Sequence, residues 1–165
     1  AKMAIRDGLT KLYNHQYFHN CLEKEFSRSS RYHAPLSLVF FDIDNFKRIN
    51  DVYGHSHGDS VLSEIGELTR NVARLSDVPA RYGGEEFAII LPSTPSEGAM
   101  EVATRLGRII RQHRFKSLDG EQITISAGIS TFQDNGVQSC DQLLQRADKA
   151  MYQAKAQGKD RVVQA

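Results

Sequence analysis

The sequence predicts an α+β fold, an α/β sandwich in which helices flank a central, mainly antiparallel sheet. Segments with helical periodicity alternate with short apolar runs that are typical of strands. Two extended runs flank Gly83-Gly84, which predicts a β-hairpin. No repeat or low-complexity linker divides the chain. Residues 1–165 therefore fit one domain, which we expect to be a fragment of a larger sensor protein.

The composition excludes several classes of function. The chain has 21 basic and 20 acidic side chains and a net charge of +1, so no strong field would attract nucleic acid or an anionic membrane. The longest apolar stretch, residues 36–41, is too short to span a bilayer. No signal peptide opens the chain. We expect a cytoplasmic domain without nucleic-acid or direct membrane contact, in a parent protein that could be membrane-anchored.

The first elements are a helix and a strand. Apolar residues at helical spacing predict a helix over residues 14–33, which Pro35 ends. The following run, residues 36–43, is apolar and rich in β-formers. It predicts a buried strand.

Two further helices are expected before the hairpin. Asp44 is a candidate cap for a short helix through residues 46–49, and residues 54–58 are expected to form a loop. Asp59 or Ser60 could cap the next helix. The predicted apolar face of that helix consists of Val61, Leu62, Ile65, Leu68, Val72 and Leu75.

The second half of the chain completes the sheet. Strands over residues 80–82 and 87–91 are expected to form the hairpin, with a tight primed turn at Gly83-Gly84. Gly158 is a helix stop. The other predicted elements are a helix over 99–110, a strand over 123–131, a helix over 143–154 and a closing strand over 161–163.

Two acidic pairs are candidates for a metal site. Asp42 ends the buried strand and stands two residues before Asp44, while Glu85 and Glu86 follow the hairpin tip. A hard divalent cation would compensate the repulsion between such carboxylates. Structural interpretations stay open: Asp44 as a cap, the glycines as a simple turn, and both glutamates as a solvated edge. Asp42 is harder to explain in this way, because an unpaired buried charge is costly.

Six segments, in order along the chain, resemble the motifs of the GGDEF domain family. They are Asp7-Gly8-Leu9-Thr10 with Leu12 and Asn14; Phe41-Asp42-Ile43-Asp44-Asn45-Phe46-Lys47 with Ile49-Asn50-Asp51; Gly54-His55 with Gly58-Asp59; Arg81-Tyr82-Gly83-Gly84-Glu85-Glu86-Phe87; Ser126-Ala127-Gly128-Ile129; and Ala147-Asp148, Met151-Tyr152, Ala154-Lys155 and Gly158-Lys159. The fourth segment has the GGEEF form of the motif. The resemblance covers nearly the whole chain.

The resemblance implies a fold like the palm of nucleotidyl cyclases and polymerases, with a ferredoxin-like core. It also implies a diguanylate cyclase, which converts two GTP molecules into cyclic di-GMP and two pyrophosphates. Two protomers would face each other as a homodimer, each holding one GTP. Each 3′-hydroxyl would attack the α-phosphate of the opposite GTP, with Mg²⁺ or Mn²⁺ as the cofactor.

The resemblance also implies residue roles. Asp42, Glu85 and the Ile43 carbonyl would bind the metal, and Glu86 would be a further active-site carboxylate beside Asp42 and Glu85. Gly83 and Gly84 would admit the nucleotide at the hairpin. The remaining implied substrate-binding residues are Phe46, the phosphate-contacting Lys47, Lys155 and Lys159, and the guanine-recognising pair Asn50 and Asp59.

An inhibitory site for the product is implied by the RxxD pattern of Arg74 and Asp77. An ordinary i, i+3 pair at a helix end is the alternative. Two positions depart from the family pattern. Lys159 replaces the common arginine and loses its bidentate fork. His15 replaces an arginine after Asn14, which puts in doubt a local ion pair with Asp7.

Two other functions stay open. A GGDEF module without catalysis could act as a sensor of GTP or cyclic di-GMP, but such a module is expected to have a broken motif, and here the motif is intact. A dimerisation or signalling domain would make the acids incidental.

Overall fold

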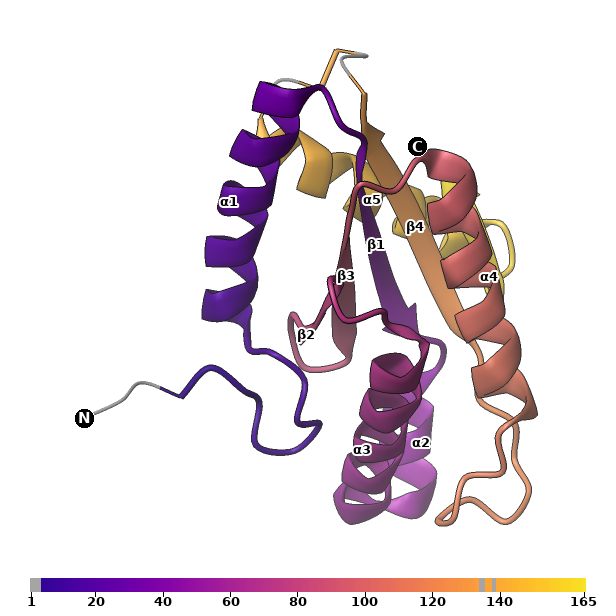
Figure 1. Ribbon diagram of the computed structural model, residues 1–165. Coiled ribbons are helices and arrows are strands. Elements are labelled where there is room, and N and C mark those ends of the chain that lie inside the picture. Colours follow the sequence, from indigo (N-terminus) through magenta and orange to yellow (C-terminus); the bar gives the residue numbers. More distant parts are fainter. Residues whose placement is uncertain (1–3, 134–135, 138) are drawn as a thin grey trace.

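The computed structural model describes residues 4–133, 136–137 and 139–165. The order of helices and strands is the predicted one (Figure 1). The elements are α1 (His15–Tyr32), β1 (Leu36–Ile43), α2 (Phe46–Tyr53), α3 (His55–Val72), β2 (Val78–Arg81), β3 (Glu86–Pro92), α4 (Ser96–Gln112), β4 (Ile125–Phe132), α5 (Cys140–Ala156) and β5 (Arg161–Gln164). None of the described helices combines the length and the apolar character needed to cross a membrane.

The five strands form one sheet in the order β2-β3-β1-β4-β5. The β2–β3, β3–β1 and β1–β4 pairs are antiparallel and only the β4–β5 pair is parallel, so the mainly antiparallel sheet is confirmed. The apolar run of β1 lies at the centre and every residue of the strand is buried. Such a continuous run is typical of a strand covered on both faces.

The alternation of side chains along β1 divides the core into two layers. Leu38 and Phe40 pack with residues of α1 and α5. Val39 and Phe41 pack with residues of α2, α3 and α4. Successive strand residues point to opposite faces. Asp42 therefore projects on the α1 and α5 side of the sheet, in line with Phe40.

The start of α3 differs from the prediction. Residues 54–58 are not a loop, because α3 begins at His55 directly after Gly54. Gly54 has a φ of 93°, a conformation that glycine adopts without strain, so the chain reverses sharply between α2 and α3. Asp59 and Ser60 lie in the second turn of α3, and the prediction that one of them caps this helix was wrong. At its other end α3 stops at Val72, which leaves Leu75 fully exposed rather than on the apolar face.

The hairpin is confirmed, but its turn is not the predicted primed type. β2 ends at Arg81 and β3 begins at Glu86, so the loop is longer than two residues. Neither Gly83 nor Gly84 is among the glycines with positive φ, which a primed turn requires. Instead, the amides of Tyr82 and Gly83 both donate to the Glu86 carbonyl, at 2.8 and 3.1 Å.

Candidate functional site

The predicted acids meet where β1 ends beside the hairpin loop. Asp42 and Glu86 are directly opposed across β1 and β3. The backbone N–H of Ile43 donates to the Glu85 carbonyl at 3.4 Å. The side chains of Asp42 and Glu85 interact with each other directly. The sheet register therefore places Glu86 across from Asp42, and the hairpin loop brings Glu85 to the same end of β1.

Asp42 has one paired and one unpaired oxygen. Its Oδ2 atom lies 3.2 Å from Lys155 Nζ, on the last turn of α5. Its Oδ1 atom is buried and has no hydrogen-bond partner among the described residues. A buried acceptor without a donor is costly unless a ligand satisfies it. The orphaned oxygen beside a second carboxylate fits a divalent cation.

The electrostatics of the cluster agree with this fit. Burial, together with the negative charge of Asp42, raises the pKa of Glu85 to about 7. Burial also raises the pKa of Asp42, against the opposing effect of the Lys155 ammonium. Burial and the Asp42 charge raise the pKa of Glu86. A bound cation favours the ionised form of each carboxyl group. It would therefore counteract the effects that raise the pKa values of these groups.

The described residues contain no group of three or more His, Cys, Asp or Glu side chains arranged to hold a metal. Two side-chain carboxylates are sufficient for Mg²⁺, which usually keeps several waters and takes further oxygens from substrate phosphates. The site is thus suited to a cation that arrives with a nucleotide, rather than to a closed structural metal centre.

Asp44 does not cap α2 and does not share the site. The N-terminal cap of α2 is Asn45, in the left-handed region at φ 57°. The Asp44 carboxylate accepts hydrogen bonds from Thr124 Oγ1 at 2.7 Å, Ser126 Oγ at 2.6 Å and the Asp160 amide at 3.0 Å. Asp44 follows the last residue of β1, Ile43, and its carboxylate is occupied by these three donors. It ties the end of β1 to β4 and to the segment before β5.

Lysines flank the same end of β1. Lys155 pairs with Asp42, and Lys159 Nζ donates to Asn45 Oδ1 at 2.7 Å. Lys47 is exposed on the first turn of α2. The structure therefore places Lys155 at the predicted metal site and Lys159 beside Asn45, just after the end of β1.

The predicted guanine-recognising pair lies on α2 and α3. A Cβ atom on Gly58 would lie 1.8 Å from Asn50 Oδ1 and 3.3 Å from the ring of Phe46, so only glycine lets the helices approach so closely. Asn50 Oδ1 is also buried, and no residue in the described part of the chain donates a hydrogen bond to it, so it is a second unsatisfied acceptor. Asp59 follows Gly58 directly and is exposed. Phe46 is largely buried in the core, with its ring close to Gly58.

The RxxD pair is formed. The Arg74 amide donates to Asp77 Oδ2 at 2.8 Å, and Arg74 Nη2 lies 3.4 Å from Asp77 Oδ1. Arg74 Nη2 also donates to Thr94 Oγ1 at 2.6 Å. Asp77 is buried, while more than half of the Arg74 side chain is exposed. Both residues border an open hollow of about 270 Å³ that is also lined by Arg70 and Leu75.

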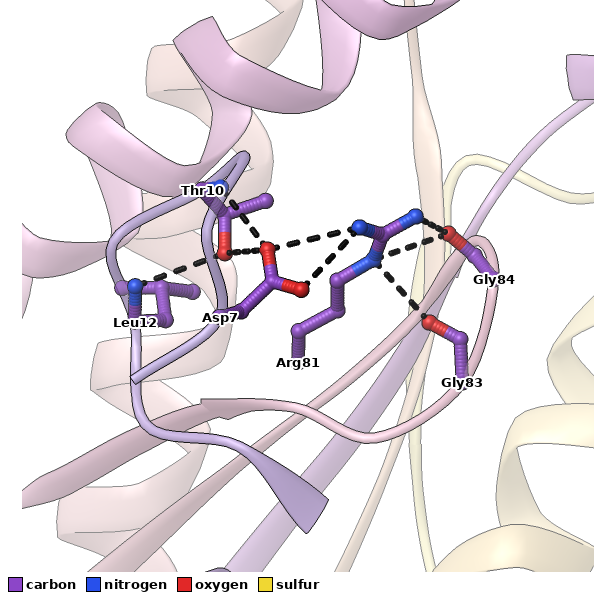
Figure 2. Close-up of polar contacts among 6 residues, drawn as sticks. All are labelled: Asp7, Thr10, Leu12, Arg81, Gly83 and Gly84. Carbon is purple, nitrogen blue, oxygen red and sulfur yellow. Dashed lines mark hydrogen bonds and ion pairs between the residues drawn. The ribbon is translucent and has the colours of Figure 1, made fainter. Parts of the chain in front are cut away.

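One residue that the sequence analysis did not assign connects two motifs. Arg81 Nη1 lies 3.2 Å from Asp7 Oδ1, and its Nε and Nη2 atoms donate to the carbonyls of Gly83 and Gly84 (Figure 2). Asp7 therefore has an ion-pair partner without an arginine at position 15. His15 instead contacts the ring of Tyr82, with centroids 4.5 Å apart. The only feature of the sequence that pointed to a role for Arg81 was its position at the start of the GGEEF segment.

Comparison with known proteins identifies close sequence relatives. A family described as "Diguanylate cyclase, GGDEF domain" matches residues 4–161. The chain is 38% identical over 165 residues to the response regulator PleD of Caulobacter vibrioides, covering 98% of this chain and 36% of PleD. It is 35% identical over 156 residues to the diguanylate cyclase DosC of Escherichia coli, covering 94% of this chain and 34% of DosC. The chain thus spans about a third of the length of these relatives.

Solved structures show the same fold. The GGDEF domain of DgcB from Caulobacter crescentus, in complex with c-di-GMP, superposes with a TM-score of 0.91 at 30% identity, covering 99% of this chain and 94% of that one. The active GGEEF domain of a diguanylate cyclase from Vibrio cholerae gives a TM-score of 0.87 at 34% identity, covering 92% of this chain and 96% of that one.

Proposed function

Because the chain belongs to the GGDEF domain family, we propose that it is a diguanylate cyclase that condenses two GTP molecules into cyclic di-GMP and two pyrophosphates. The observation that supports this proposal most strongly is that the Asp42 and Glu85 carboxyl groups interact directly, while Asp42 Oδ1 is unsatisfied. The use of GTP would place this activity in the cytoplasm.

Asp42, Glu85 and the Ile43 carbonyl are the residues that would hold Mg²⁺ or Mn²⁺. A bound divalent cation supplies neutralisation of phosphate charge and lowers the pKa of the attacking hydroxyl. Lys155 keeps one oxygen of Asp42 occupied and leaves the other for this ligand. The fit rests on two carboxylates and one orphaned oxygen.

The other residues would hold GTP in place. Lys47, Lys155 and Lys159 provide positive charge for the triphosphate near the end of β1. Gly83 and Gly84 leave room for the nucleotide at the hairpin. Asp59 can accept hydrogen bonds from guanine N1–H and N2–H, while the Asn50 amide meets O6 or N3. An acid at position 59 favours GTP over ATP.

The reaction joins two such sites. Each 3′-oxygen forms a bond to the α-phosphorus of the opposite GTP, the bond from that phosphorus to pyrophosphate breaks, and the hydroxyl proton leaves. Glu85 and Glu86 are the nearby carboxylates to which this proton can move. Each chain carries one set of acids, so two copies must face each other as a homodimer. Phosphoryl transfer depends mainly on such positioning and charge stabilisation.

Arg74 and Asp77 would form an inhibitory site for the product. The exposed Arg74 guanidinium can pair bidentately with a phosphate or a guanine edge of cyclic di-GMP. Thr94 and the buried Asp77 hold this guanidinium beside an open hollow, which supports a ligand site more than an isolated surface pair does.

The test is incubation of the chain with GTP and Mg²⁺ over a range of protein concentrations, followed by chromatography. We expect cyclic di-GMP, at a rate that rises more steeply than linearly with protein because two copies must meet. Glu85→Gln should fold but form no product, while Glu25→Gln on α1 serves as the matched control. Tight GTP binding without turnover at any concentration would favour the sensor alternative.

A further inference from the structure

Arg81 links the N-terminal turn, residues 5–14, to the loop that carries Glu85. From this geometry we propose that Arg81, anchored by Asp7, is a positioning residue that holds Glu85 opposite Asp42. The proposal deepens the proposed cyclase function and rests on it for its kinetic consequence. Its structural part can be measured without any turnover.

Arg81 fixes the two peptide units that precede Glu85. Its Nε atom donates to the carbonyls of Gly83 and Gly84, both at 3.2 Å, and its Nη2 atom donates to the Gly84 carbonyl at 2.8 Å (Figure 2). Glycines have no side chains to hold them in one conformation. The planar guanidinium supplies the missing constraint, because its donors have a fixed fork geometry.

Asp7 holds the other end of the guanidinium. Arg81 Nη1 lies 3.2 and 3.3 Å from the two Asp7 oxygens. Asp7 Oδ2 also accepts from the amide and the hydroxyl of Thr10, both at 2.8 Å. Partial burial by itself would raise the pKa of Asp7, but these hydrogen bonds and the Arg81 charge lower it. The anchor is therefore a carboxylate at neutral pH.

The N-terminal turn is itself docked firmly. The Arg81 amide donates to the Tyr13 carbonyl at 2.9 Å, and the Tyr13 amide donates to the Pro79 carbonyl at 3.1 Å. Leu12 is completely buried. Thr10 lies so close to Gly66 of α3 that a Cβ atom there would approach within 2.8 Å. Asp7 thus belongs to a turn that is bonded to β2 and packed against α3.

These contacts make it possible to distinguish a local role of the Arg81 side chain in the hairpin loop from a role in the stability of the whole domain. The backbone pairing with Tyr13 persists if the Arg81 side chain changes, so the turn and β2 should stay together. Among the described residues, the loop then keeps the two amide contacts to the Glu86 carbonyl and the long bond from the Ile43 amide to the Glu85 carbonyl, at 3.4 Å. Glu85 would lose its fixed distance to Asp42, and with it part of the affinity for a divalent cation.

The experiment compares Arg81→Lys and Asp7→Asn with the control Arg28→Lys, which changes an exposed ion pair on α1. Mn²⁺ binding without nucleotide, hydrogen exchange along the chain, and kcat and KM for GTP are measured for each. Arg81→Lys should weaken Mn²⁺ binding about 10- to 100-fold, a range typical of residues that orient metal ligands. It should lower kcat by a similar factor with little change in KM. Asp7→Asn should have a smaller effect, and the double variant should be no worse than Arg81→Lys alone.

Hydrogen exchange decides between positioning and stability. We expect faster exchange in Arg81→Lys only at residues 82–86. Unchanged exchange and Mn²⁺ binding, or faster exchange throughout the chain, would overturn the proposal. If the wild-type chain makes no cyclic di-GMP, the proposed function fails, while exchange and Mn²⁺ binding still test the role of Arg81.

Discussion

Lys155 Nζ lies 3.2 Å from Asp42 Oδ2, while Asp42 Oδ1 is buried without a hydrogen-bond partner. The lysine comes from the last turn of α5 and the aspartate from the centre of the sheet. The Lys155 ammonium thus compensates part of the negative charge of the buried acidic cluster, and Asp42 Oδ1 remains available to a ligand.

Loss of Lys155 should destabilise the chain in a pH-dependent way. In Lys155→Gln the buried Asp42 charge loses its partner, so we expect the melting temperature at pH 8 to fall by about 3 °C, the shift for about 1 kcal/mol in a domain of this size. The fall should be smaller at pH 5, because the pKa of Asp42 is raised and lowering the pH reduces the negative charge that Lys155 compensates. Calorimetry checks this, with the exposed Lys149→Gln on the same helix as control. Equal losses at both pH values would contradict the ion pair.

The raised pKa of Glu85 makes stability depend on pH and on metal. Its folded pKa is about 7 against an ordinary value of 4.5, so the folded chain keeps a proton that the unfolded chain releases. Stability from this group is complete below pH 4.5 and is lost as the pH rises through 7. Mg²⁺ should therefore raise the melting temperature more at pH 8 than at pH 5.5. Glu85→Gln should remove this difference, and its persistence in that variant would place the cation elsewhere.

The contact between Gly58 and Asn50 should control GTP binding. In Gly58→Ala the new Cβ would meet Asn50 Oδ1 at 1.8 Å, so Asn50 must move. A displacement of about 1 Å at a positioning residue can cost about 100-fold, and we expect a loss of this order in GTP affinity by calorimetry. Gly107→Ala on α4 is the control, because its Cβ would meet only Ile125 at 4.0 Å. Wild-type affinity in Gly58→Ala would exclude Asn50 from nucleotide binding.

Removal of the Arg74 guanidinium should relieve product inhibition. Hydrogen bonds to charged groups contribute about 1.5–3 kcal/mol, so Arg74→Ala should raise the inhibitory concentration of cyclic di-GMP about 10- to 100-fold. The initial rate without product should stay near that of the wild type. Initial rates at increasing added product measure both, with Arg28→Ala as control. An unchanged inhibition curve would leave Arg74 and Asp77 as an ordinary ion pair.

Local patterns predicted most of the fold. The apolar run of β1 and the helical periodicities depend on neighbours in sequence, and they gave all ten elements in the correct order. The errors occurred where tertiary contacts decide. Asp44 would suit a helix cap, but it accepts hydrogen bonds from Thr124, just before β4, and from Ser126 of β4 instead. Gly83 and Gly84 predict a tight turn, but the hydrogen bonds from the Arg81 guanidinium to their carbonyls hold a longer loop.

The acidic residues of the candidate site were also predicted from the sequence, whereas the contacts that hold the site residues in place were not. Asp42 and Glu85 were identified by their unusual position and by the resemblance to a family. The Asp7–Arg81 pair joins positions 74 residues apart, and no local pattern indicates such a contact. Asn50 was named through the resemblance, but its packing against Gly58, with Oδ1 buried and without a hydrogen-bond partner among the described residues, appears only in the structure.

The central claim is that Asp42 and Glu85 share a divalent cation. Crystals of the chain soaked in Mn²⁺ with a non-hydrolysable GTP analogue, and measured at a wavelength where manganese scatters anomalously, test it most directly. We predict an anomalous peak within bonding distance of both carboxylates, about 2.1 Å from their oxygens, with Lys155 still beside Asp42 Oδ2. A peak that touches neither carboxylate, or a bound analogue with no peak between them, would contradict the account.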